Sequence, residues 1–246
     1  MKTSSIVVII IAALLGLFFG NALGGLTWAL ILGVISAAAA WLAVRQYETS
    51  APAVAGEYEV PDPPFARFLF ADTRSAALWL PLRLFVGWEW LEAGWHKFED
   101  PKWMTTGEAL QGYWTNAVRI PEQGRPPITF EWWRGFIQSL LDIEAYTWFG
   151  KLITFGEMAV GLGLILGALV GVAAFGGALM NMSFLLSGST SSNPVLFLLA
   201  VFLILGWKVA GWIGLDRWLL PMLGTPWRGG ALFRRDTPAA VAPPAP

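Results

Sequence analysis

The stretch AALWLPLRLFVGWEWLEAGWHKF, residues 76–98, determines how the chain is interpreted. It is long and apolar enough for a membrane-spanning helix, which needs about 20 predominantly apolar residues. It nevertheless contains Arg83, Glu89 and Glu92 and includes the only histidine of the chain, His96. A charge at the centre of a bilayer costs about 2.5–3.5 kcal/mol on insertion scales, so such residues usually face a protein interior or a wet cavity. The stretch therefore predicts a spanning helix that carries a functional site.

Helical periodicity divides this stretch into two faces, because successive residues rotate by about 100°. One face carries carboxylates and an imidazole among aromatic rings: Phe85, Trp88, Glu89, Glu92, Trp95 and His96. The opposite face carries Arg83, Gly87, Trp90 and Gly94. Its two glycines predict that a neighbouring helix backbone approaches closely on that side.

The composition of the whole chain is that of a polytopic, all-α membrane protein. Of its 246 residues 56% are hydrophobic and 13% are charged, whereas soluble domains are about 25% charged. The net charge of -1 and the absence of a basic run argue against nucleic acid as a partner. With no cysteine and one histidine, the sequence offers no thiolate metal ligands, no iron–sulfur cluster and no bis-histidine haem site, and no flavin or metal site is evident.

Six hydrophobic segments follow one another along the chain, at about 5–20, 26–44, 76–98, 148–166, 170–186 and 194–213. We divide the chain into an amino-terminal transmembrane hairpin (1–45), a cytoplasmic linker (46–75), a four-helix core (76–227) and a flexible cytoplasmic tail (228–246). Residues 1–20 also resemble a cleavable signal, and that alternative stays open. The core includes an outer loop at 99–146. In this loop, residues 130–143 predict an amphipathic helix whose apolar face carries Trp133, Phe136, Ile137, Leu140 and Leu141.

Lysine and arginine positions predict the orientation. Six spans place both ends on the same side, together with Lys2, Arg45, Arg67, Arg74, Arg217, Arg228, Arg234 and Arg235. The 99–146 loop balances its basic residues with acidic ones. We therefore expect both termini in the cytoplasm and this loop outside.

The candidate catalytic residues are Glu89, Glu92 and His96, because a carboxylate–imidazole face suits the proton transfer that accompanies quinone reduction. Trp88 and Trp95 flank it as candidate quinone-binding residues. The alternative is a structural ion-pair network with Arg83, Lys97 or Lys151 as its cations. A metal site is not predicted, because Glu-Glu-His lacks a recognised ligand spacing.

Four further residues are candidates for ligand binding: Arg83, Lys97, Glu157 and Asn181. Glu157 lies in the middle of a hydrophobic segment, where a buried carboxylate needs a partner or must be neutral. Arg83 is the expected partner of Glu157, which gives both a structural alternative. Asn181 lies in the next segment and either binds ligand or joins two helices through its amide.

Four stretches in this order resemble the DoxX/DoxD family of small membrane proteins: 83–103, 155–167, 178–194 and 206–227. The resemblance covers residues 76–227 and implies a four-helix membrane core. In the DoxD branch it implies the membrane subunit of a thiosulfate:quinone oxidoreductase, which transfers electrons from thiosulfate to quinone and forms tetrathionate. It also implies a DoxA-like partner subunit.

The sequence as a whole predicts a multi-pass protein of a bacterial or archaeal cytoplasmic membrane, in contact with lipid. We expect a subunit of a quinone-linked oxidoreductase, with quinone as the diffusible acceptor and thiosulfate as the candidate donor. The alternative is a non-catalytic scaffold subunit of a respiratory or photosynthetic complex. A small transporter is a third hypothesis, disfavoured by the lack of inverted repeats.

Overall fold

The computed structural model describes residues 6–7, 9–14, 16–17, 26–49 and 61–225. These residues form helices and turns, and no strand occurs among them, so the prediction of an all-α chain is confirmed. The chain divides into two compact units, residues 1–61 and 62–246. The tail at 228–246, the predicted turn at 21–25 and residues 50–60 of the predicted linker lie outside the described residues.

The first unit is a pair of packed helical segments. The described residues between 6 and 17 are helical, and α2 (Leu26–Thr49) follows. Small residues allow the contact: a methyl group on Gly33 would lie 2.8 Å from the side chain of Leu17. Most large apolar side chains of this unit that the structure describes remain exposed, among them Leu26, Val34 and Leu42.

The second unit begins earlier than expected. Residues 64–75 belong to the predicted linker but form α3 (Pro64–Ala71) and the 3₁₀ helix η1 (Thr73–Ser75). The indole of Trp79 donates a 2.9 Å hydrogen bond to the carbonyl of Leu69, and Leu69 and Phe70 pack against the core. Apolar Phe and Leu side chains in this short segment therefore attach it to the core.

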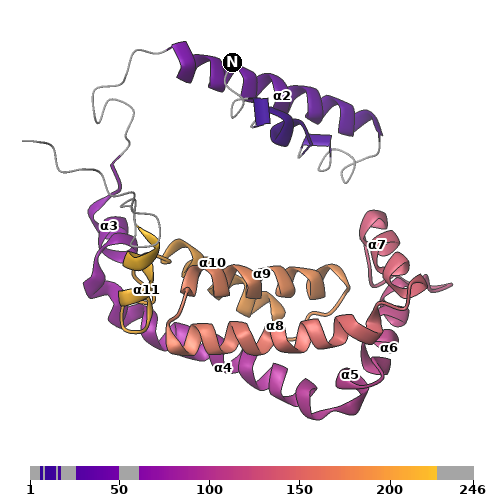
Figure 1. Ribbon diagram of the computed structural model, residues 1–246. Helices are drawn as coiled ribbons and strands as arrows, with labels where there is room; N and C mark the ends of the chain where they lie inside the picture. The colour runs from indigo at the N-terminus through magenta and orange to yellow at the C-terminus, as the bar shows by residue number, and fades with distance from the viewer. Residues whose placement is uncertain (1–5, 8, 15, 18–25, 50–60, 226–246) are drawn as a thin grey trace, which may run out of the picture. The chain divides into compact units, whose positions relative to one another are not determined.

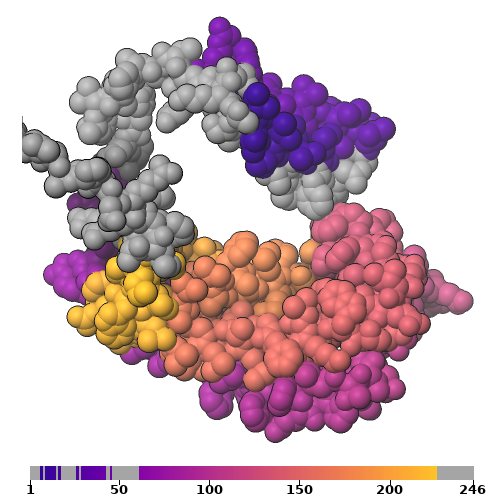
Figure 2. All heavy atoms as spheres, viewed as in Figure 1, coloured from indigo at the N-terminus to yellow at the C-terminus, as the bar shows by residue number. Residues whose placement is uncertain are grey.

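The remaining helices of the second unit are α4 (Ala76–Glu99), α5 (Pro101–Met104), α6 (Glu108–Val118), α7 (Glu131–Asp142), α8 (Tyr146–Leu166), α9 (Val170–Leu186), α10 (Asn193–Leu205) and α11 (Asp216–Leu223). α4 packs most extensively against α8, and α9 packs against α10 and α8 (Figure 1). Atoms of α8, α9 and α10 adjoin one another on the face seen in Figure 2.

Glycines set the close approach of α4 and α8. A methyl group on Gly87 would lie 3.0 Å from the carbonyl oxygen of Gly161, and one on Gly94 would lie 2.9 Å from the backbone nitrogen of Met158. Trp90, on the same face of α4, is also buried. The two-faced prediction for residues 76–98 is thus confirmed on its glycine side, and α4 runs antiparallel to α8.

A second, smaller core lies where α6, α7 and the start of α8 meet. It is built from Leu110, Trp114, Ala117, Ile128, Ile137 and Ala145. The predicted amphipathic helix at 130–143 corresponds to α7. Ile137 of its predicted apolar face is buried as expected, but Arg134, which the prediction placed off that face, is buried too. Arg134 is buried because its guanidinium donates to the carbonyl of Ile128 at 2.6 Å and to the carboxylate of Glu131.

Among the described helices, α8 alone is both long enough and apolar enough to cross a membrane unaided. α9 and α10 are apolar but shorter, and α4 has sufficient length but carries several charges. The sixth predicted segment, 194–213, is helical only as far as Leu205, because the chain turns at Gly206 and continues as turns to residue 215.

Candidate functional site

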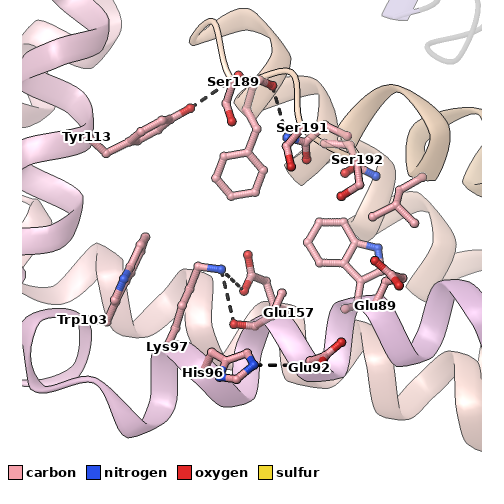
Figure 3. Close-up of a pocket in the computed structure, with 16 residues that line it drawn as sticks. Glu89, Glu92, His96, Lys97, Trp103, Tyr113, Glu157, Ser189, Ser191 and Ser192 are labelled. Atoms are coloured by element: carbon pink, nitrogen blue, oxygen red, sulfur yellow. Dashed lines mark hydrogen bonds and ion pairs between the residues drawn. The ribbon is translucent and has the colours of Figure 1, made fainter.

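A polar pocket of about 440 Å³ opens among α4, α8, α9 and the turn before α10. It is lined by Glu89, Trp90, Glu92, Ala93, His96, Lys97, Trp103, Tyr113, Glu157, Asn181, Phe184, Ser189, Ser191, Ser192, Asn193 and Leu196. Ten of these side chains are labelled in Figure 3. Six predicted site residues therefore surround one cavity, although they come from three different helices.

An ion pair lies on the floor of this pocket. The ammonium nitrogen of Lys97 is 2.7 Å from Oε2 of Glu157, and their side chains are 19% and 1% exposed (Figure 3). Lys97 also approaches the carbonyl oxygen of Ala93 at 3.4 Å and lies 5.2 Å from the ring centre of Trp103. Because the ammonium neutralises the buried carboxylate, the pocket floor has little net charge of its own.

Two buried groups that line the same pocket have no hydrogen-bond partner in the part of the chain that the structure describes. Asn181 is fully buried, yet neither its amide nitrogen nor its amide oxygen is satisfied. The indole nitrogen of Trp90, a residue that is 3% exposed, is likewise unsatisfied. An unpaired buried polar group costs about 1–3 kcal/mol, so these groups are expected to meet a molecule that enters the pocket.

The predicted catalytic residues form the rim rather than the floor. The Nε2 atom of His96 is 4.0 Å from Oε1 of Glu92, and both side chains are more than half exposed (Figure 3). Glu89 is partly exposed and lies one turn away along α4. Their position lets them exchange protons with solvent, and they are too open to hold a ligand by themselves.

Trp88 and Trp95 do not line the pocket, although the sequence places them beside the carboxylates. They are 59% and 49% exposed, on the face of α4 that points away from the pocket. The predicted six-residue face of α4 spans a wider angle around the helix than the pocket does. Only the edge of that face, with Glu89, Glu92 and His96, turns toward α8 and α9. Trp88 and Trp95 are therefore not part of this site.

Arg83 is also absent from the pocket, and the expected Arg83–Glu157 pair is wrong. A methyl group on Gly94 would lie 3.2 Å from the Cβ atom of Glu157, whereas the guanidinium of Arg83 contacts Gly167. Ten residues of α8 separate these two points, which corresponds to about 15 Å along the helix axis. The antiparallel register of α4 and α8 thus places Glu157 next to Lys97, and these two residues form the ion pair.

Arg83 instead holds the turn that follows α10. It is 2% exposed, and its guanidinium donates to the carbonyl of Ile213 at 2.8 Å. From the same region, the carboxylate of Asp216 accepts hydrogen bonds from the backbone nitrogens of Leu169 at 2.6 Å and Val170 at 2.9 Å. These contacts fasten the 206–216 segment to the start of α9, which is a structural role.

Tyr113 and the serines of the 189–192 turn were not among the predicted site residues. The hydroxyl of Tyr113 donates to the carbonyl of Phe184 at 3.4 Å, and their rings meet edge to face. Burial raises the pKa of Tyr113, although hydrogen bonds with Ser187 and Ser189 oppose the shift, so its hydroxyl is neutral at physiological pH. Only the contact between α6 and α9 reveals this residue, because its sequence surroundings are those of an ordinary loop.

Within the described part of the chain, no group of three or more histidine, aspartate or glutamate side chains is placed to hold a metal ion. Comparison of the chain with models of known protein families, with curated proteins and with solved structures finds no match. The resemblance to DoxX/DoxD proteins stays a prediction that rests on the four quoted stretches.

Proposed function

We propose that this chain is a multi-pass subunit of a quinone-linked oxidoreductase in a bacterial or archaeal cytoplasmic membrane, with the polar pocket as the binding site for the quinone head group. The observation that carries the proposal is the pair of unsatisfied groups, Asn181 and Trp90, beside the buried Lys97–Glu157 pair. Quinone carbonyl oxygens accept hydrogen bonds, and both residues offer free N–H donors.

The Asn181 amide suits both redox forms of such a ligand. Its nitrogen donates to a quinone carbonyl, and its oxygen accepts from the hydroxyl of a quinol. Quinone takes up two electrons and two protons to become quinol. The protons would reach the ring from solvent through the exposed Glu92 and His96, and a partner subunit, DoxA-like or part of a larger electron-transport complex, would supply the electrons.

Charge favours a neutral ligand over thiosulfate in this pocket. The lining carries three carboxylates, Glu89, Glu92 and Glu157, against the single ammonium of Lys97. A dianion would be repelled by the two rim carboxylates, because Lys97 is already engaged by Glu157. If thiosulfate is the electron donor, we expect its oxidation on the partner subunit.

Exposed apolar surface supports the membrane location. α8, α9 and α10 expose a series of large apolar side chains: Leu152, Phe155, Leu162, Val172, Phe175, Leu179, Val195, Leu198 and Phe202. Soluble monomers rarely expose contiguous apolar surface on this scale, whereas lipid would cover it without cost. This arrangement agrees with the multi-pass, four-helix core that the DoxX-like stretches imply.

Replacing Asn181 with leucine tests the quinone site. The change removes both polar atoms, so we expect quinone affinity to fall by about tenfold, the equivalent of one or two hydrogen bonds. Because the amide is buried without a partner, its loss should leave thermal stability equal or higher. Decylquinone binding by the full chain in nanodiscs would be measured through tryptophan quenching, with the exposed Asn116→Leu as the matched control.

Retained affinity in Asn181→Leu would contradict the quinone site. A fall in stability equal to the fall in affinity would instead assign Asn181 a structural role. The second candidate function is a scaffold subunit, which is favoured by the exposed Trp88 and Trp95 on the outer side of α4. A scaffold would be purified together with partner proteins and would not bind quinone in either variant.

A further inference from the structure

A second cavity, of about 570 Å³ and almost wholly apolar, adjoins the polar pocket. It lies among α6, α7, α8 and α9, and its walls include Trp133, Phe136, Leu152, Met180 and Leu179. Both volumes fall within the range of ordinary small-molecule sites, about 300–1,000 Å³. We refer to this second cavity as the apolar groove.

Two residues belong to both cavities. Tyr113 and Phe184 line the polar pocket and the apolar groove, so their rings form the partition between them. The two rings meet edge to face with their centres 6.2 Å apart, and the Tyr113 hydroxyl donates to the main-chain carbonyl of Phe184 at 3.4 Å. The same hydroxyl has hydrogen bonds with Ser187 and Ser189. A ligand that occupied both cavities would therefore contact these two side chains.

The apolar groove is also open toward the exposed side of the helices. Phe136, Leu152 and Leu179, on three of its helices, are 46%, 56% and 53% exposed. In the membrane location proposed above, these side chains face lipid, so the groove would open sideways into the bilayer. A hydrocarbon chain could thus reach the groove without crossing water.

We propose that the apolar groove holds the hydrocarbon tail of the quinone whose head group occupies the polar pocket, with Tyr113 and Phe184 at the junction of ring and tail. This inference rests on the proposed function and defines its ligand as a long-chain quinone. One molecule fits both cavities because they share a wall at Tyr113 and Phe184 and differ in polarity as the two parts of such a ligand do. The polar pocket suits the ring, and the apolar groove suits the hydrocarbon tail. Figure 3 shows Tyr113 at the end of the polar pocket opposite Glu89, where a tail would leave it.

The glycines of the groove permit a direct test. A methyl group on Gly176 would lie 3.6 Å from the side chain of Val160, and one on Gly156 would lie 3.5 Å from the sulfur of Met180, both ordinary contacts. Leucine at either position can therefore be accommodated while its outer atoms occupy the groove. Gly135 on α7 has open space around it and does not line the groove, so Gly135→Leu is the matched control.

The experiment compares two quinones with the same ring, one bearing a decyl tail and one bearing only a methyl group, on the full chain in nanodiscs. We expect Gly176→Leu to weaken binding of the tailed quinone by about tenfold, the equivalent of roughly two methylene groups. The methyl quinone should bind wild type and Gly176→Leu within about twofold. Gly135→Leu should leave both affinities unchanged.

A photoreactive group near the end of the tail gives an independent readout. Adducts should form on residues 176–187 and 133–140, and Gly176→Leu should reduce them. Equal effects of Gly176→Leu on both quinones, or tail adducts confined to the outer side of α4, would overturn the inference while leaving the head-group site intact. Retention of a phospholipid in the quinone-saturated protein would assign the groove to an acyl chain instead. Failure of both quinones to bind wild type would overturn the proposed function and this inference together.

Discussion

The Lys97–Glu157 pair is the side-chain interaction on which the polar pocket depends. Glu157 is 1% exposed, and its described partner is an ammonium 2.7 Å away. Removing one member of a buried ion pair leaves the other uncompensated and costs about 3–5 kcal/mol, whereas replacing both is often neutral. The free energy of unfolding should therefore respond differently to single and double changes.

Lys97→Met alone should destabilise the protein by about 3–5 kcal/mol, and adding Glu157→Met should recover most of that loss. Arg83 supplies the comparison, because it lies about 15 Å along the helix axis from Glu157. Arg83→Met should remove the hydrogen bond to the carbonyl of Ile213, and its effect should add to that of Glu157→Met. Thermal unfolding in detergent would compare the three single variants and the two double variants with the wild type. Coupling of Glu157 to Arg83 rather than to Lys97 would contradict the observed pairing.

For individual residues, the sequence predicts which polar side chains are unusual in an apolar segment, but not which of them contact one another. Glu157 and Asn181 are recognisable because each is a polar residue inside an apolar segment. The partner of Glu157 depends on the register between α4 and α8, which hydropathy does not determine. Tyr113 lies far from both in sequence and reaches the pocket only because α6 folds back against α9.

Among the helices, the contact between α4 and α8 is the one most sensitive to single substitutions. A methyl group on Gly161 would lie 2.6 Å from the backbone nitrogen of Leu91 and 2.8 Å from the carbonyl oxygen of Gly87. Both neighbours are backbone atoms, so neither can rotate away. A side chain at position 161 would therefore fit only if the two helices moved apart.

Gly161→Ala should destabilise the protein by about 1–3 kcal/mol, because overpacking forces the two helices apart. Gly156→Ala, one and a half turns away on α8, is the control, since its methyl group would meet only the sulfur of Met180 at 3.5 Å. Tryptophan fluorescence during thermal unfolding compares the two variants. Equal stability of Gly161→Ala and Gly156→Ala would show that the helices separate more easily than the contact suggests.

Helix positions follow from hydropathy where apolar runs are bounded by polar residues. The predicted segments 76–98, 148–166 and 170–186 correspond closely to α4, α8 and α9. The sixth segment fails after Leu205, because hydropathy cannot distinguish a helix from an apolar turn. In residues 206–214, three glycines and the carbonyls that accept from Arg83 favour turns instead. α7 is a helix as predicted, but the burial of Arg134 was missed, because it depends on the carbonyl of Ile128 in the loop before the helix.

At the scale of the whole molecule, exposed apolar surface predicts a membrane location, and the distribution of charge predicts the orientation. α8 alone among the described helices meets the length and hydropathy of an independent span, yet α9 and α10 expose large apolar side chains along their length. Shorter helices can be held in a bilayer when they pack against a longer neighbour, as α9 does against α8. The lysine and arginine positions then predict which side each loop occupies.

Cysteine labelling tests the location and the orientation together, because the chain has no cysteine of its own. Thr115 is exposed on α6, within the loop predicted to lie outside, and Thr237 belongs to the tail predicted to lie in the cytoplasm. An impermeant maleimide should label Thr115→Cys in intact cells and Thr237→Cys only after permeabilisation, with the cysteine-free parent as the control.

The opposite pattern would reverse the orientation and place the rim residues Glu92 and His96 on the cytoplasmic side. Protons for quinone reduction would then be drawn from the cytoplasm. Labelling of both positions in intact cells would require an even number of spans between them and so rule out the predicted three. Recovery of the chain in the soluble fraction would contradict the membrane location itself.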